Sequence, residues 1–167
     1  MAIHSSQDRV NLIRLPKPSY PYALPRFRVT LVRDNRAVPP SSPLTTSATA
    51  TALLRPLFAG LDREQFLVCG LDAKHRIVGV NIVSIGSLTL AIVHPREVFK
   101  PLILMNAVAW IGAHNHPSSD PTPSHEDRVL TSRLRQGAEL LGIIMLDHLV
   151  LTDERYYSFA DQGWPGA

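Results

Sequence analysis

One short apolar segment constrains the fold more than any other part of this 167-residue chain. Residues 107–113 are apolar without interruption and are too few for a typical helix. A run of this kind is typical of a β-strand that is buried on both faces. Such a strand lies inside a sheet that has helices on both sides. The segment therefore predicts an α/β fold in which a sheet forms the middle layer.

The segments around this strand fit the same architecture. Apolar residues at helical spacing predict helices over about 47–60, 95–106 and 124–141. Apolar or alternating runs predict further strands over 64–71, 77–85, 88–93, 143–151 and 156–159, and a lone edge strand over 27–31. Pro56 is expected to kink the first helix or to mark its true start. The order of the elements predicts one domain with a mixed sheet covered by helices.

The first 46 residues read as a proline-rich, basic tail. Residues 1–36 hold seven Lys/Arg and two Asp, a net charge of +5, whereas residues 37–167 hold ten basic and twelve acidic residues, a net charge of −2. We therefore expect a poorly ordered tail over 1–46, a folded domain over 47–160 and a C-terminal tail over 161–167. The tail offers a weak contact for DNA phosphates, but the folded part lacks the basic charge of a nucleic-acid site.

The sequence also indicates in which cellular compartment the protein is expected. Its one cysteine, Cys69, excludes an internal disulfide and fits a reducing environment. No apolar run approaches the ~20 residues that a membrane-spanning helix needs. The first residues lack the apolar core of a signal peptide. We expect a cytoplasmic protein without a membrane contact.

Two histidines follow the end of the buried strand at positions 114 and 116, and Asp127 lies in the first turn of the next predicted helix. In extended backbone, residues i and i+2 point to the same side, so both imidazoles can converge on one ion. The ten residues between His116 and Asp127 can bring the helix start back beside the strand end. Two imidazoles and one carboxylate are a usual ligand set for catalytic zinc, with water in the fourth position. The sequence predicts one Zn²⁺ per chain.

Hydrolysis by a zinc-bound water also needs a group that takes the proton of the water. Glu64, at the polar start of a predicted strand, is the best candidate, and Glu97 and Glu126 compete with it. Ser124 could stabilise the oxyanion, although Ser-x-x-Asp also predicts a helix cap. His148 lies in an apolar strand, so we expect an interior histidine and, as the alternative, a supporting role at the metal site.

These residues carry a resemblance. The pattern His-x-His-Pro-x6-Ser-x2-Asp over 114–127 resembles the JAMM motif of the JAB/MPN metalloprotease superfamily. The amino-acid sequence of this loop is similar to that of the bacterial RadC branch. Two other stretches share this similarity, Pro-Arg-Glu-Val-Phe over 95–99 and Leu-Asp-His over 146–148. The resemblance covers about residues 47–160.

The resemblance implies a cytidine-deaminase-like, three-layer α/β/α sandwich. It implies that His114, His116 and Asp127 hold zinc, that Glu64 polarises the water and that Ser124 stabilises the oxyanion. The chain departs from the pattern in two places. RadC-like proteins usually have glycine where Ser119 stands, and residues 1–46 do not resemble the helix-hairpin-helix region that many of them carry.

Three functions follow from these observations. The leading interpretation is a zinc-dependent metallopeptidase or isopeptidase that acts on a peptide or protein substrate. The alternative is a DNA-associated protein of the RadC type in DNA repair or mobile-element biology, without peptidase activity. A third is a zinc-binding scaffold that has lost its activity. The sequence does not identify the substrate.

Overall fold

The structure, a computed structural model, describes residues 29, 31–32, 39–86 and 93–165. A five-stranded mixed sheet forms its centre, with the strand order β2-β1-β3-β4-β5. β3 and β4 are parallel, and the other neighbouring pairs are antiparallel. The strands are β1 (Gln65–Leu71), β2 (Ile77–Ile85), β3 (Ala109–Asn115), β4 (Ile144–Leu151) and β5 (Tyr156–Ser158).

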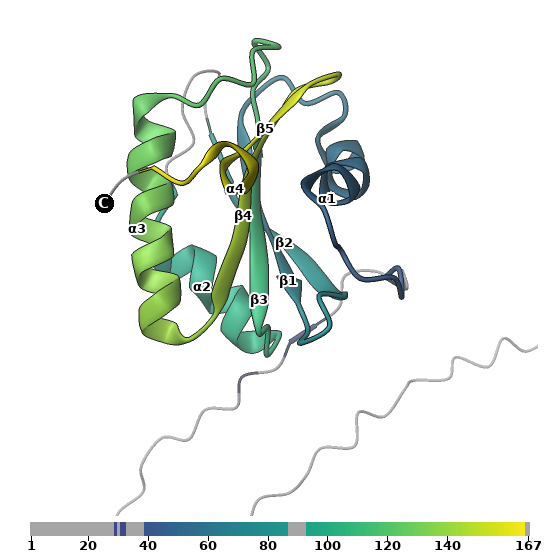
Figure 1. Cartoon of the computed structure of the whole chain (residues 1–167), viewed down its shortest axis with the longest axis vertical. Coiled ribbons are helices and arrows are strands. Elements are labelled where there is room, and N and C mark those ends of the chain that lie inside the picture. Colours follow the sequence, from purple (N-terminus) through teal and green to yellow (C-terminus); the bar gives the residue numbers. More distant parts are fainter. Residues whose placement is uncertain (1–28, 30, 33–38, 87–92, 166–167) are drawn as a thin grey trace, which may run out of the picture.

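Helices cover both faces of the sheet, as Figure 1 shows. The helical elements are α1 (Ser47–Leu54), the 3-10 turn η1 (Arg55–Phe58), α2 (Pro95–Leu104), α3 (His125–Leu141) and α4 (Phe159–Gln162). α1 lies on one face, and α2 and α3 lie together on the other. The predicted α/β fold with a mixed sheet in the middle layer is thus confirmed, and the arrangement is consistent with the JAB/MPN type.

The core has two parts, one on each face of the sheet. All seven residues of β3 are buried, as the continuous apolar run predicts. Alternate residues of this strand serve the two parts: Ile111 packs on the α1 side, and Trp110 packs on the side of α2 and α3. Cys69 is fully buried on the α1 side, and burial raises the pKa of its thiol to about 12, so it behaves as a small apolar residue.

The ends of the helices follow local rules. Ser124 is the N-cap of α3 and accepts a hydrogen bond from the backbone N–H of Asp127. Gly142 ends this helix in the left-handed conformation, with a φ of 68°, which glycine adopts without strain. The first predicted helix differs from the expectation: α1 stops at Leu54 and continues as a 3-10 turn, because Pro56 has no N–H to donate to the turn before it.

Some predicted elements lie at the edge of the described residues. Of the expected strand over 88–93, only Val93 is described, and it is not in a strand. Val29 and Leu31, from the expected strand over 27–31, are also not in a strand, and the other three residues lie outside the described part. The seven basic residues of the tail lie outside it as well.

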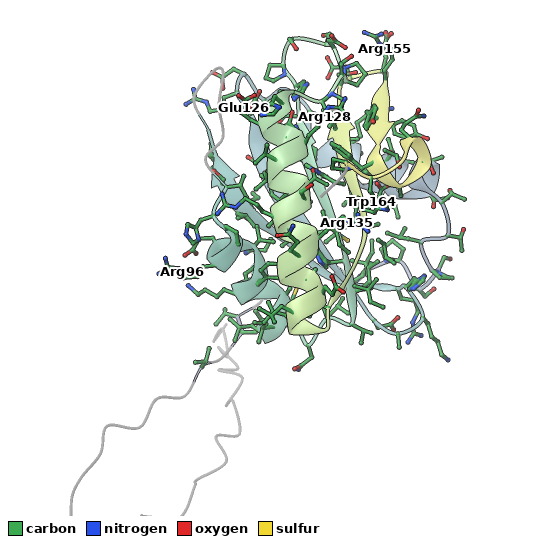
Figure 2. All side chains as sticks on the ribbon, turned by 60° about the vertical axis from the view of Figure 1, so that its left-hand side comes forward. Arg96, Glu126, Arg128, Arg135, Arg155 and Trp164 are labelled. Atoms are coloured by element: carbon green, nitrogen blue, oxygen red, sulfur yellow. The ribbon has the colours of Figure 1, made fainter. Side chains whose placement is uncertain are left out.

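The C-terminal segment contributes to the fold beyond the last strand. Residues 161 and 162 belong to α4, which the sequence did not predict. Trp164 packs against the core on the side of α3, and the guanidinium carbon of Arg135 lies 4.4 Å from its ring centroid (Figure 2). Among the described residues, no helix is long and apolar enough to cross a membrane.

Candidate metal centre

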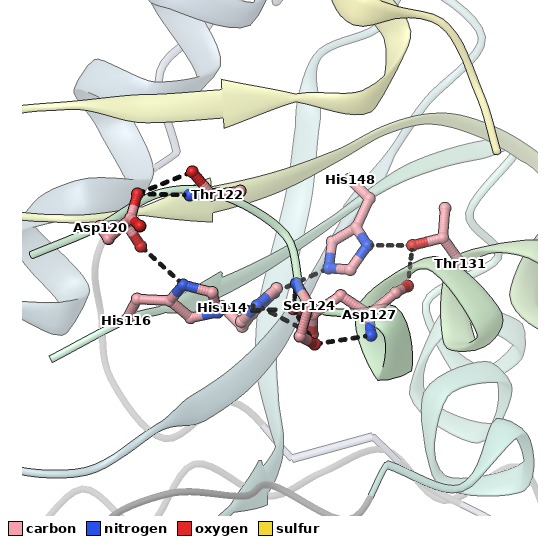
Figure 3. Close-up of polar contacts among 8 residues, drawn as sticks. All are labelled: His114, His116, Asp120, Thr122, Ser124, Asp127, Thr131 and His148. Atoms are coloured by element: carbon pink, nitrogen blue, oxygen red, sulfur yellow. Dashed lines mark hydrogen bonds and ion pairs between the residues drawn. The ribbon is translucent and has the colours of Figure 1, made fainter. Parts of the chain in front are cut away.

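Three side chains from the segment 114–127 meet at the end of β3, as Figure 3 shows. His114 belongs to the end of β3, His116 to the following loop and Asp127 to the first turn of α3. The two Nε2 atoms lie 3.1 Å apart. Asp127 Oδ1 lies 3.2 Å from Nε2 of His114, and Oδ2 lies 3.5 Å from Nε2 of His116. The structure therefore brings together the three residues that the sequence predicted as ligands, and they could hold a metal ion.

The loop after β3 turns His116 back toward the sheet. The backbone N–H of His116 still donates to the carbonyl of Leu151 on β4, so the histidine stands at the very end of the sheet. Its Nδ1 lies 2.8 Å from the carbonyl oxygen of Asp120. A carbonyl only accepts, so Nδ1 carries the proton, and Nε2 presents a lone pair to the site. Ser119 has a φ of 62°, which lies in the left-handed region that favours glycine.

Asp127 is held by the capping box of α3. Its Oδ2 accepts hydrogen bonds from the backbone N–H and the hydroxyl of Ser124, at 2.8 and 2.6 Å. Burial works against the charged carboxylate, but the contacts with His114, His116 and Ser124 outweigh it and hold the pKa of Asp127 well below its ordinary value. The side chain is 16% exposed. An ionised carboxylate is thus fixed in the place where a cation would need it.

The same contacts act on His116. Burial disfavours its charge, but the hydrogen bonds to Asp127 and to the Asp120 carbonyl, with the charges of Asp127 and Glu64, raise its pKa. The site therefore attracts positive charge at the point where the ligand atoms meet. A proton can supply that charge in part, and a metal ion can supply it in full.

Glu64 directly precedes β1, and the register of β1 with β3 explains why its charge reaches His116. Phe66 pairs with His114, so Glu64 lies two residues further along, opposite His116. The side chain of Asn115 bridges the same place: its Oδ1 accepts from the backbone N–H of Gln65 at 2.8 Å, and its Nδ2 donates to the carbonyl of Arg63 at 3.0 Å. Asn115 thus holds the backbone on both sides of Glu64. The two competing glutamates are exposed in the first turns of α2 and α3.

Two more polar residues support the site: sequence reasoning assigned a supporting role to His148 only as the alternative, and it found no signal for Thr131. His148 on β4 lies beside His114, and Thr131 on α3 lies beside His148. Both are fully buried, with 0% of their surface exposed. In the sequence, His148 was marked by its place in a mostly apolar strand and by the Leu-Asp-His stretch over 146–148.

A cavity of about 340 Å³ opens beside His116, between η1 and the loop after β3. Apolar side chains such as Phe58, Leu61 and Pro117 line it, together with Arg55. A cavity that combines apolar walls with a few polar groups is the common form of a ligand site. It offers room for a substrate next to the cluster.

Comparisons with known proteins agree with this geometry. A family model described as the RadC-like JAB domain matches residues 44–164. This chain belongs to the RadC-like JAB domain family. The match includes every residue of the cluster, and it supports membership of the JAB-type hydrolase superfamily.

Relatives of this RadC-like chain occur in archaea and bacteria. A UPF0758 protein of Methanosarcina acetivorans is 47% identical over 113 residues, which are 68% of this chain and 49% of the relative. A UPF0758 protein of Symbiobacterium thermophilum is 53% identical over 110 residues, which are 66% of this chain and 47% of the relative. The chain spans about half the length of the curated relatives that it matches. Their names state no reaction, so they support the family and not a substrate.

Proposed function

We propose that this RadC-like chain is a zinc-dependent hydrolase, a metallopeptidase or isopeptidase of the JAMM type. One observation carries the proposal. The Nε2 atoms of His114 and His116 lie 3.1 Å apart beside a cavity, and each lies close to one oxygen of the Asp127 carboxylate, at 3.2 and 3.5 Å. Three hydrogen-bond acceptors so close together repel one another unless a positive charge lies between them.

The donor set fits zinc better than other common ions. Magnesium and calcium prefer sites built from oxygen alone, whereas two imidazoles with one carboxylate are typical of catalytic zinc. A closed structural site would need a fourth protein ligand, and the cluster within the described residues has three members. The remaining position would take water, and zinc would lower the pKa of that water toward ~7.

Residues of this chain would supply the rest of the chemistry. Asn115 holds the backbone on both sides of Glu64. The Glu64 carboxylate would take the proton of the attacking water and pass it to the leaving amine. Ser124 would donate to the oxyanion. Its hydroxyl is bonded to Asp127 in this structure, so it would have to turn away from the cap to do so. The cavity beside His116 would receive the peptide or protein substrate.

The experiment that tests this function compares zinc-loaded wild type with Glu64→Gln on a library of proteome-derived peptides and isopeptide-linked peptides, read by mass spectrometry. We expect chelator-sensitive cleavage by the wild type and its loss in Glu64→Gln, which keeps its zinc. Loss of one general base lowers the rate by about 10²- to 10⁴-fold. No cleavage by the loaded wild type, or equal cleavage by both proteins, contradicts the proposal.

The net charge of +5 on residues 1–36 favours a second candidate, a DNA-associated protein of the RadC type. The tail would contact phosphates without reading sequence, so binding would weaken steeply as salt is raised. Titration of duplex DNA against the whole chain and against a form without residues 1–46 separates the two candidates. Salt-dependent binding that needs the tail supports this function, and binding unchanged by the deletion contradicts it.

A further inference from the structure

A buried polar relay lies behind the candidate metal centre (Figure 3). Nε2 of His148 lies 2.9 Å from Nδ1 of His114. Nδ1 of His148 lies 2.6 Å from Oγ1 of Thr131. The Thr131 hydroxyl in turn donates to the carbonyl oxygen of Asp127, one turn earlier in α3, at 2.6 Å. The relay therefore begins at one candidate ligand and ends at another.

The direction of each hydrogen bond follows from the end at Thr131. A hydroxyl has one proton, and the Asp127 carbonyl can only accept it, so Oγ1 of Thr131 must accept from Nδ1–H of His148. A neutral imidazole with its proton on Nδ1 has a lone pair on Nε2. His148 consequently accepts the Nδ1–H of His114. This leaves Nε2 of His114 without a proton, facing His116 and Asp127.

The surroundings of His148 favour the neutral ring that this direction requires. The ring stacks on Phe159 at 5.1 Å between centroids and lies 5.4 Å from Phe66. Charge in such an apolar place is costly unless it is paired. Gly112 lies opposite His148 on β3. A Cβ there would lie only 3.1 Å from the ring of Phe66 and 3.2 Å from that of Trp110, and at ordinary contact distance, 3.5 Å, from His148.

We propose that His148, oriented by Thr131, is a positioning residue that keeps His114 in the tautomer with the proton on Nδ1. The nitrogen Nε2 is thereby always available to a cation. This inference rests on the proposed metal function and deepens it. Metal-binding histidines commonly donate their second N–H to a carboxylate, a backbone carbonyl or water. The backbone of β3 is paired with β1 on one edge and with β4 on the other. A side chain, that of His148, therefore accepts the second N–H of His114.

The test uses two pairs of variants of the whole chain. His148→Leu removes the acceptor, whereas His148→Gln keeps an acceptor near the position of Nε2. Thr131→Val removes the hydroxyl at nearly constant shape, whereas Thr131→Ser keeps it. The first readout is the tautomer of His114 in the metal-free protein, from long-range ¹⁵N–¹H correlation spectra. The second readout is zinc affinity, from competition with a chromophoric chelator.

We expect Nδ1–H of His114 in the wild type and a mixture of tautomers in His148→Leu, with zinc bound about 10- to 100-fold more weakly. His148→Gln and Thr131→Ser should remain close to the wild type, and Thr131→Val should move in the direction of His148→Leu. If His148→Leu fails to fold, Thr131→Val decides by the same two readouts.

The proposal is overturned if the metal-free wild type carries the proton on Nε2 of His114. It is also overturned if the tautomer and the zinc affinity are unchanged in both His148→Leu and Thr131→Val. Failure of the proposed function looks different. Zinc would then bind without any peptide being cleaved, or would not bind at all, while the tautomer of His114 would still report on the relay.

Discussion

His114 and His116 present the same ring nitrogen to the same point, yet they stand in different surroundings. His114 is on a strand inside the sheet, and its Nδ1 contacts the buried side chain of His148. His116 is in an exposed loop, and its Nδ1 contacts the backbone carbonyl of Asp120. We call the part of the site around His114 the strand side and the part around His116 the loop side. The orientation of the imidazole depends on side chains on the strand side and on backbone conformation on the loop side.

The difference has a physical origin. In a sheet, the carbonyl groups of a central strand are used by its neighbours, so an imidazole on that strand needs a side chain as its acceptor. In a loop, carbonyl groups are free of such pairing. Substitutions on the strand side should accordingly have large effects on the site, and substitutions on the loop side should have small ones.

The largest expected effect comes from the residue that the two sides share. Asp127→Asn removes the charge that faces both histidines and keeps an oxygen for the cap of α3. We expect zinc affinity to fall further than the ~10- to 100-fold typical of residues outside the ligand set. Isothermal titration with zinc measures it, with Glu126→Gln in the same turn as the matched control. Equal affinities for the two variants would contradict the ligand role.

On the strand side, Asn115→Leu should weaken the fold and separate binding from catalysis. It leaves a buried N–H of Gln65 and a carbonyl of Arg63 without their partner, so we expect the free energy of unfolding to fall by about 1–3 kcal/mol. Zinc should still bind, because both histidines remain, but peptide cleavage should fall with the displacement of Glu64. Urea unfolding and zinc titration measure the two effects. Unchanged cleavage by the folded variant would show that Asn115 does not position Glu64.

A smaller effect is expected at Asp147, the buried neighbour of His148. Burial raises its pKa, against hydrogen bonds from Ser158 and from the backbone N–H groups of residues 160 and 148. A raised pKa stabilises the folded chain below the unfolded value of about 3.9, and this contribution is lost as the pH rises through the folded pKa. Asp147→Asn does not titrate and keeps an acceptor.

The stability of Asp147→Asn relative to the wild type should therefore increase with pH. Urea unfolding of both proteins, free of metal, between about pH 4 and about pH 7 measures the difference. If the free energies of unfolding of the two proteins differ by the same amount at every pH, burial does not raise the pKa of Asp147.

The smallest effect belongs to the loop side. Ser119 has a φ of 62°, and glycine adopts this conformation without the clash of a Cβ. Ser119→Gly should change the free energy of unfolding by no more than ~1 kcal/mol and leave zinc affinity within about threefold of the wild type. Thermal unfolding and zinc titration check this. A large loss of zinc affinity would show that the loop side is as sensitive to substitution as the strand side.

Local patterns explain how much the sequence could predict. The i, i+2 spacing of His114 and His116 and the cap at Ser124 are local, so the three candidate ligands follow from short stretches of sequence. The three-layer fold follows from the buried strand for a similar reason. Pro56 also acted locally, since it converts the end of the first helix into a 3-10 turn.

The contacts of the supporting residues could not be found in this way. His148 reaches His114 because β3 and β4 pair in parallel, and Thr131 reaches His148 because α3 packs on β4. Asn115 reaches the segment around Glu64 through the register of β1 with β3. These contacts depend on tertiary packing between distant segments, which periodicity and spacing do not encode. The division of the chain at residues 46 and 160 stays a prediction.

We propose above all that the cluster of two histidines and one aspartate holds zinc. Plasma mass spectrometry of purified wild type and His116→Ala, each before and after addition of zinc and removal of the excess, tests it most directly. We expect about one zinc per chain in the wild type and almost none in the variant. A wild type without zinc even after addition, or a variant that retains as much, would contradict it.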